Sequence, residues 1–200
     1  PFEQPGRRGE TVVRAASERP NGDADASVCL GDLAEFLPLN LGGVMVEDQV
    51  YMERALELAQ MAAAIWEVPV GAVVVCDGQI VGEGYNRRES GKNALAHAEL
   101  EAIDMACRRL GGWRLHRCDL YVTLEPCPMC AGAIVNARIR RVVYGASDPK
   151  AGCFGSVSDF NALPFNHKPE IVSGVLQNEC AGLLSAFFKE LRNRLKNPGQ

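Results

Sequence analysis

Histidines, aromatic residues and long apolar stretches are scarce in this chain. Among its 200 residues are three histidines, and 6% of the residues are aromatic. No apolar run approaches the roughly twenty residues that a membrane-spanning helix needs. No succession of charged, apolar and small residues marks a secretory signal peptide. We therefore expect a soluble protein, and any metal site must be built from few histidines.

The apolar content is sufficient for one hydrophobic core. Hydrophobic residues make up 47% of the chain and charged residues 23%, which is typical of a single globular domain. The chain is too long and too rich in apolar runs for its eight cysteines to indicate a disulfide framework. We expect free thiols in or beside the core at Cys76, Cys107, Cys118, Cys153 and Cys180. Free thiols predict a reducing, cytoplasmic location.

Residues 1–48 differ in composition from the rest of the chain. They hold nine acidic residues, four arginines, scattered glycine and proline, and little apolar periodicity. We expect an acidic, disordered N-terminal extension there and a folded domain over residues 49–200. That second part holds 17 Lys and Arg against 16 Asp and Glu, so the net charge of −4 comes from the extension.

Two short motifs carry the chemistry: His97-Ala-Glu99 and, further along, Pro126-Cys127-Pro-Met-Cys130. A zinc ion that activates water takes three protein ligands and leaves its fourth tetrahedral position open. His97, Cys127 and Cys130 supply three ligands of the right kind. Glu99 follows the histidine by two residues, where a carboxylate can reach a water at the open position without binding the metal. The spacing predicts a catalytic zinc site with Glu99 as its general acid and base.

Other interpretations of these motifs exist. A Cys-x-x-Cys also occurs in redox pairs and in structural zinc sites. A structural site needs a fourth ligand, yet His116 and His167 are not at a paired spacing with His97. A redox pair has no use for an upstream His-x-Glu. A zinc-stabilised module that binds RNA without turnover stays open, and Glu99 discriminates, because such a module does not need that carboxylate.

The joint pattern is the sequence signature of the zinc nucleobase and nucleoside deaminases. The chain resembles most closely the bacterial tRNA-specific adenosine deaminases, from about residue 51 to about residue 194. The matching segments are Val-Pro-Val-Gly-Ala at 68–72, Gly-Tyr-Asn at 84–86, Leu-Glu-Pro-Cys-Pro-Met-Cys-Ala-Gly-Ala at 124–133, Glu-Cys at 179–180 and Phe-Phe at 187–188. One departure lies at 93–96, where Asn-Ala-Leu-Ala replaces the family's usual Asp-Pro-Thr-Ala.

The resemblance implies a hydrolase that converts adenosine to inosine at the wobble position of tRNA, on the arginine tRNA with anticodon ACG, and releases ammonia. It implies one zinc ion per subunit, a tRNA anticodon stem-loop as substrate and a homodimer. A deaminase of a free nucleobase or nucleotide, such as guanine or a cytosine compound, is the alternative. Both would use the same metal chemistry.

The resemblance also implies contacts to the RNA. The residues it assigns to substrate binding are Asn86, Val70, Ala98, Asp148, Lys150 and Phe188. A carboxamide such as that of Asn86 offers both a donor and an acceptor to a purine edge. Two adjacent phenylalanines on a helix point in different directions, so one of Phe187 and Phe188 is expected in the core. Three basic clusters, at 87–92, 138–141 and 189–196, are candidate phosphate contacts.

Apolar periodicity and turn signals predict an α/β chain. The expected helices are 49–66, 94–110, 127–136 and 178–195, and the expected strands are 70–76, 79–85, 120–124, 141–144 and 171–176. We expect about five helices in all, on both faces of a five-stranded mixed sheet. This is a three-layer α/β/α, cytidine-deaminase-like fold, as the resemblance also implies. His97 and Glu99 would lie in the first turn of one helix, close to the start of the helix that carries the two cysteines.

Overall fold

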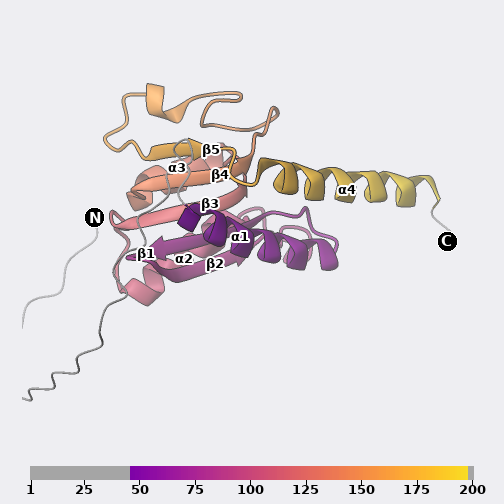
Figure 1. Ribbon diagram of the computed structural model, residues 1–200, viewed down its shortest axis with the longest axis horizontal. Helices are drawn as coiled ribbons and strands as arrows, with labels where there is room; N and C mark the ends of the chain where they lie inside the picture. Colours follow the sequence, from indigo (N-terminus) through magenta and orange to yellow (C-terminus); the bar gives the residue numbers. More distant parts are fainter. Residues whose placement is uncertain (1–45, 198–200) are drawn as a thin grey trace, which may run out of the picture. The chain divides into compact units, whose positions relative to one another are not determined.

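The computed structural model describes residues 46–197 (Figure 1). Its elements are α1 (Val46–Ala64), β1 (Gly71–Cys76), β2 (Gln79–Tyr85), α2 (Ala98–Leu110), β3 (Cys118–Leu124), α3 (Pro128–Ala137), β4 (Arg141–Ala146), β5 (Glu170–Ser173) and α4 (Gln177–Lys196). A short 3-10 turn, Phe160–Ala162, precedes β5. The described part thus has four α-helices, where about five helices were expected. Of the extension expected at 1–48, residues 1–45 lie outside the described part of the chain.

None of these helices is both long enough and apolar enough to cross a membrane.

The five strands form one mixed sheet in the order β2-β1-β3-β4-β5. β1 runs antiparallel to both β2 and β3, whereas β3, β4 and β5 are parallel to one another. The β1–β2 hairpin turns at Asp77 (φ 49°) and Gly78 (φ 76°). Positive φ at both central positions is the geometry of a type I′ turn, for which Asp-Gly is a preferred sequence. The mixed α/β/α architecture expected from the sequence is confirmed.

Alternate residues of each strand face opposite helical layers. Val73 and Val143 belong to a core cluster with α1 and α4. Val74 and Val142 belong to a second cluster, formed with α2 and α3. In Figure 1 the α1 helix crosses the sheet on one side, and the two helices that carry the metal motifs lie on the other. The candidate metal ligands are therefore placed by a single layer of the fold.

Two glycines in β2 let α2 approach the sheet closely. A Cβ atom added at Gly84 would lie 2.3 Å from the carbonyl oxygen of Ala98, and one at Gly82 would lie 2.1 Å from that of Ala102. Both distances are too short for any side chain, so only glycine permits this packing. This close contact fixes the distance between the sheet and the first turn of α2, which begins directly after His97.

The start of α1 is tied to the centre of the sheet by an ion pair. Asp48 is 1% exposed, and its carboxylate accepts hydrogen bonds from Arg141 Nη1 at 2.8 Å and Arg141 Nη2 at 2.6 Å. The Tyr121 hydroxyl donates to the same carboxylate at 2.9 Å. A bidentate Arg–carboxylate pair of this kind is directional and strong. Asp48 is thus part of the folded domain, three residues into the helix that begins at Val46.

Candidate metal centre and active-site cavity

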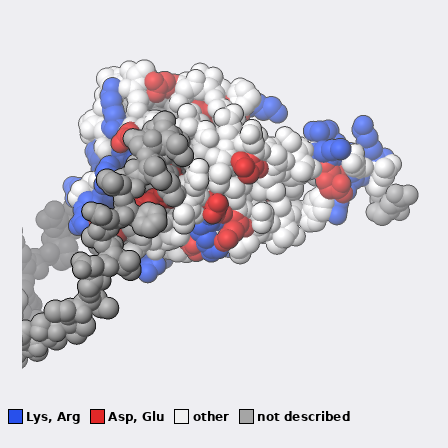
Figure 2. Space-filling view, viewed as in Figure 1, with Lys and Arg blue, Asp and Glu red and all other residues white. Residues whose placement is uncertain are grey.

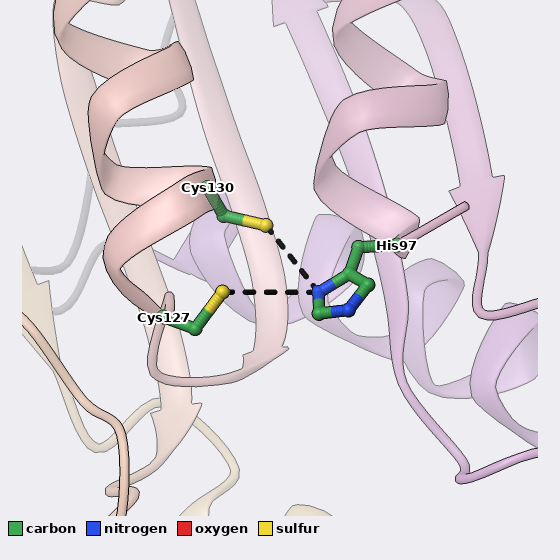
Figure 3. Close-up of side chains that lie close together, drawn as sticks. All are labelled: His97, Cys127 and Cys130. Atoms are coloured by element: carbon green, nitrogen blue, oxygen red, sulfur yellow. Dashed lines mark hydrogen bonds between the residues drawn. The ribbon is translucent and has the colours of Figure 1, made fainter. Parts of the chain in front are cut away.

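The two metal motifs occupy equivalent places in the fold. His97 directly precedes α2, with φ −84° and ψ 149°, and Cys127 directly precedes α3, with φ −73° and ψ 173°. Extended backbone at both positions turns these side chains towards each other across the gap between the two helices (Figure 3). Cys130 follows on the first turn of α3 and points to the same side. The expected convergence of the two helix starts is confirmed.

The second helix begins later than the sequence indicated. Helix was expected from residue 94, but the side-chain oxygen of Asn93 accepts a hydrogen bond from the Leu95 N–H at 3.0 Å. The Asn93 carbonyl also accepts from the Ala96 N–H at 3.1 Å. Asn side chains stabilise turns in this way, in competition with helix. His97 therefore lies just before the first turn of α2 instead of within it, and Glu99 lies in that turn.

The three candidate ligand atoms have the spacing of a zinc site. His97 Nδ1 lies 3.8 Å from Cys127 Sγ and 3.6 Å from Cys130 Sγ. In a tetrahedral zinc site, a nitrogen and a sulfur at the usual bond lengths lie about 3.5 to 3.6 Å apart. All three ligand atoms lie within 4.8 Å of one another. His97, Cys127 and Cys130 therefore fit one zinc ion, with a fourth position left for solvent.

The electrostatics of the sulfurs also suit a metal. The hydrogen bond from the Cys130 thiol, followed by that of His97, lowers the pKa of Cys127 to about 4. The same hydrogen bond and burial raise the pKa of Cys130 above its ordinary value. One sulfur is thus already a thiolate at neutral pH, and the other must release its proton when a metal binds.

A cavity of about 230 Å³ opens beside these ligands. His97, Glu99 and Cys127 line it, whereas Cys130 is fully buried behind it. Glu99 is 4% exposed, and burial raises the pKa of its carboxyl group. A carboxyl group whose pKa is raised can both accept and return a proton.

Comparisons with known proteins agree with this geometry. Residues 45–146 match the family described as the cytidine and deoxycytidylate deaminase zinc-binding region. The chain belongs to this deaminase family. It is 52% identical over 153 residues to a tRNA-specific adenosine deaminase of Bacillus subtilis, covering 76% of this chain and 95% of that protein.

A second relative and a solved structure extend the comparison. The tRNA-specific adenosine deaminase of Haemophilus influenzae is 47% identical over 151 residues, covering 74% of this chain and 87% of that one. A structure from a study of A-to-I editing by tRNA:A34 deaminases at the wobble position of transfer RNA is 48% identical, with a TM-score of 0.66. It covers 68% of this chain and 99% of the solved one.

The deaminase cavity contains four of the six residues expected at the substrate. Val70, Asn86, Ala98 and Asp148 all line it. The other two, Lys150 and Phe188, lie outside this cavity and instead line a separate hollow of about 320 Å³. That hollow is completed by Leu184, Ser185 and Arg192. Segment 148–151 borders both spaces, because Asp148 and Ala151 face the cavity and Lys150 faces the hollow.

The two adjacent phenylalanines of α4 differ in exposure, and one of them lies in the core as expected. Phe187 is buried and packs near Trp66, with ring centroids 6.2 Å apart. Phe188 is 40% exposed, and its ring meets that of Phe187 edge-on, with the centroids 5.5 Å apart. Phe188 is thus the member of the pair that is accessible to a ligand.

Sequence reasoning missed two buried carboxylates of this deaminase. Glu67 accepts hydrogen bonds from the Ser90 N–H at 2.5 Å and from Asn86 Nδ2 at 3.3 Å. Burial alone would raise the pKa of Glu67, but hydrogen bonds from Ser90 and Glu89, together with the charge of Arg88, outweigh it and lower that pKa. Glu125 lines the cavity, and hydrogen bonds, first of all from the Ser156 hydroxyl, likewise outweigh burial and lower its pKa. One sequence signal could have found them: each glutamate follows the end of an apolar element and precedes a proline by one or two residues.

Two of the three basic clusters are largely engaged within the domain. Arg87 pairs with Glu101 at 2.8 Å and Arg140 with Asp119 at 2.9 Å. Arg141 is held by Asp48. On α4, Lys189, Arg192, Arg194 and Lys196 are all exposed, and Arg194 pairs with Glu190 at 3.7 Å and lies over the Trp66 ring. Figure 2 shows Lys and Arg atoms gathered around the C-terminal end of this helix.

Proposed function

We propose that this protein converts adenosine to inosine at the wobble position of a tRNA by zinc-assisted hydrolysis, with release of ammonia. The observation that carries the proposal is the placement of the buried Glu99 carboxylate in one cavity with His97 and Cys127. The choice of substrate is supported by the relatives, since proteins 52% and 47% identical to this chain are named tRNA-specific adenosine deaminases.

The proton chemistry falls to Glu99. Held by His97, Cys127 and Cys130, zinc would lower the pKa of a water at its open coordination position. Glu99 takes the proton that this water gives up as the oxygen attacks the amine-bearing ring carbon. It then delivers this proton to the ring nitrogen. The proton that remains on the attacking oxygen passes through Glu99 to the exocyclic amine, so that the C–N bond breaks and ammonia leaves as the carbonyl forms. Its raised pKa allows Glu99 to hold the proton between these transfers.

The target base is held by residues around the same cavity. Val70 and Ala98 offer apolar walls, and Asn86 offers a polar group to the purine edge. The NH2 group of Asn86 donates to Glu67 and, at 3.3 Å, to the carbonyl of Val68. These bonds fix which way the amide points, so the side-chain oxygen is the group presented to the base. A fixed acceptor favours a base that carries a donor at that position.

The RNA around the target is held outside the cavity. Lys150 and Phe188 border the hollow next to it, and Arg192 completes this hollow with a cation. An exposed aromatic ring can stack on an unpaired loop base while cations bind phosphates. The basic end of α4 continues the same surface chemistry (Figure 2). A tRNA anticodon loop presents bases that are already unpaired, which lowers the cost of extruding the target adenosine.

A homodimer and a cytoplasmic location complete the proposal. All seven cysteines in the described part are free thiols, which is in keeping with a reducing compartment. Sedimentation at micromolar concentration is the test of self-association. A monomer alone under those conditions would exclude the dimer.

The decisive experiment uses an unmodified transcript of the arginine tRNA with anticodon ACG. The transcript is incubated with purified protein, and its wobble base is read as A or I by reverse transcription. We expect conversion by the wild type and none by Glu99→Ala. If zinc-loaded, folded wild type leaves the adenosine intact, the tRNA proposal is wrong, and ammonia release from guanine and cytosine compounds becomes the next assay.

A further inference from the structure

A buried carboxylate lies directly between the metal motif and the segment that borders the substrate cavity. Glu125 follows the last residue of β3 and precedes Cys127 by two residues. It is 1% exposed and lines the cavity. The proton chemistry described above does not use it. Its side chain instead reaches into segment 148–156, more than twenty residues away in sequence.

Both oxygens of Glu125 accept hydrogen bonds from this segment. Oε1 accepts from the Phe154 N–H at 2.9 Å and the Ser156 N–H at 3.1 Å. Oε2 accepts from the Asp148 N–H at 3.0 Å and from the Ser156 hydroxyl. Four donors around one buried carboxylate leave it little freedom to move. The donors come from both ends of the segment, so Glu125 holds these ends together.

The segment is shaped around the carboxylate. A Cβ atom added at Gly152 would lie 2.3 Å from Glu125 Oε2, so any side chain there would displace it. The neighbouring Pro126 carbonyl accepts from the Cys153 N–H at 3.0 Å. Residues 125 and 126 therefore set the position of segment 148–156 relative to the metal ligand that follows them.

This segment carries groups that face the substrate. Asp148 and Ala151 line the cavity, and Lys150 lines the adjoining hollow. Within the segment, the Lys150 N–H donates to Asp148 Oδ1 at 2.9 Å. The Asp148 N–H is itself bound by Glu125 Oε2. The positions of Asp148 and Lys150 thus depend on the Glu125 carboxylate through one short chain of contacts.

We propose that Glu125 is a positioning residue for RNA recognition, which acts by holding segment 148–156 at the mouth of the cavity. This inference rests on the proposed function, because it assigns RNA to the surface that the segment presents. Both oxygens of the Glu125 carboxylate are engaged by donors of this segment. Its loss therefore weakens the binding of RNA and leaves the chemical step largely intact.

Glu125→Gln is the sharpest variant, because it keeps the size of the side chain and removes one acceptor. Two N–H donors, of Phe154 and Ser156, favour the amide oxygen at the Oε1 position. The amide NH2 group then faces the Asp148 N–H, and two donors cannot bond to each other. The variant should release the Asp148 end of the segment while the other end stays bound.

Steady-state kinetics on the tRNA transcript test the inference, together with zinc content, melting temperature and a filter-binding Kd for the transcript. For Glu125→Gln we expect KM and Kd about ten-fold higher, kcat within about three-fold of wild type, and unchanged zinc. Asp104→Asn makes the same carboxylate-to-amide change at an exposed pair with Arg108, outside the segment, so its KM should stay close to that of wild type. KM and Kd unchanged in an active Glu125→Gln protein would overturn the inference.

A second pair of variants decides the matter if Glu125→Gln does not fold. Gly152→Ala pushes against the carboxylate, whereas an added Cβ at Gly182, exposed on α4, meets no atom within 4 Å. We expect KM to rise in Gly152→Ala and to stay unchanged in Gly182→Ala. Equal KM values in the two variants would overturn the inference. A wild type that leaves the transcript unmodified refutes the proposed function itself, and the inference falls with it.

Discussion

His97 Nδ1 lies 3.6 Å from Cys130 Sγ, although the two residues are 33 positions apart in the chain. The histidine stands at the start of α2 and the cysteine in the first turn of α3. Neither helix alone can bring these atoms together. The metal centre therefore exists only when both helices are packed on the same face of the sheet, so metal binding and folding support each other.

Replacing Cys130 by serine should abolish zinc binding. Serine is a poor zinc ligand. Mutating a residue that only orients a metal ligand typically weakens metal binding about 10- to 100-fold. The loss of one of the three ligands themselves should therefore weaken zinc binding by about 100-fold or more. Elemental analysis of the purified protein gives the zinc content per chain. Cys107→Ser, at a half-buried thiol of α2 away from the cavity, is the matched control and should keep its zinc.

Replacing Glu99 by glutamine should separate metal binding from catalysis. The amide cannot carry the proton, so kcat should fall by about 10² to 10⁴ while zinc content stays the same. The wobble-base assay measures the activity. Glu101→Gln lies on the same helical turn and removes a carboxylate that pairs with Arg87, so it controls for loss of charge. An active Glu99→Gln enzyme would refute the role assigned to this residue.

Asp48 should be required for the stability of the domain. Removing it leaves Arg141 with its side chain only 14% exposed and without its bidentate partner. Breaking such a pair from one side costs about 3 to 5 kcal/mol. Urea unfolding of Asp48→Ala measures this loss. Asp104→Ala, which breaks an exposed pair with Arg108, should cost less than about 1 kcal/mol.

The Asp48–Arg141 ion pair also indicates where a stable folded domain must begin. We expect a chain that begins at residue 46 to unfold at the same urea concentration as the full chain. A chain that begins at residue 49 lacks Asp48 and should be destabilised as Asp48→Ala is. Equal stability of the two shortened chains would contradict the importance of this ion pair.

The stabilisation that Glu67 gives to the folded protein should be lost at acid pH. Its pKa is lower in the folded protein than in the unfolded chain, so the unfolded chain binds more protons at acid pH. The stabilisation is complete above the ordinary carboxyl pKa and is lost as pH falls through the lowered one. The gap in unfolding free energy between wild type and Glu67→Gln should therefore be largest at pH 7 and shrink on acidification. A gap that stays constant down to pH 3 would show that Glu67 does not titrate in this way.

The sequence by itself determined the features that depend on neighbours in the chain. His-x-Glu and Cys-x-x-Cys set the ligand types and their local spacing, and Asp77-Gly78 set a hairpin turn, because two positive φ values are required there. Strand alternation set which residues of one strand share a face of the sheet. These features follow from short-range geometry, so the order of residues along the chain is enough to predict them.

Tertiary structure decided what the isolated charges do. Nothing local distinguishes Asp48 from the acidic residues that precede it, or Arg141 from a phosphate-binding arginine, yet the two are bound to each other across 93 positions. Glu67 and Glu125 each directly follow an element predicted from the sequence, but each accepts hydrogen bonds from a segment more than twenty residues away. A buried charge takes its role from the donors that surround it, and only the folded chain brings those donors together.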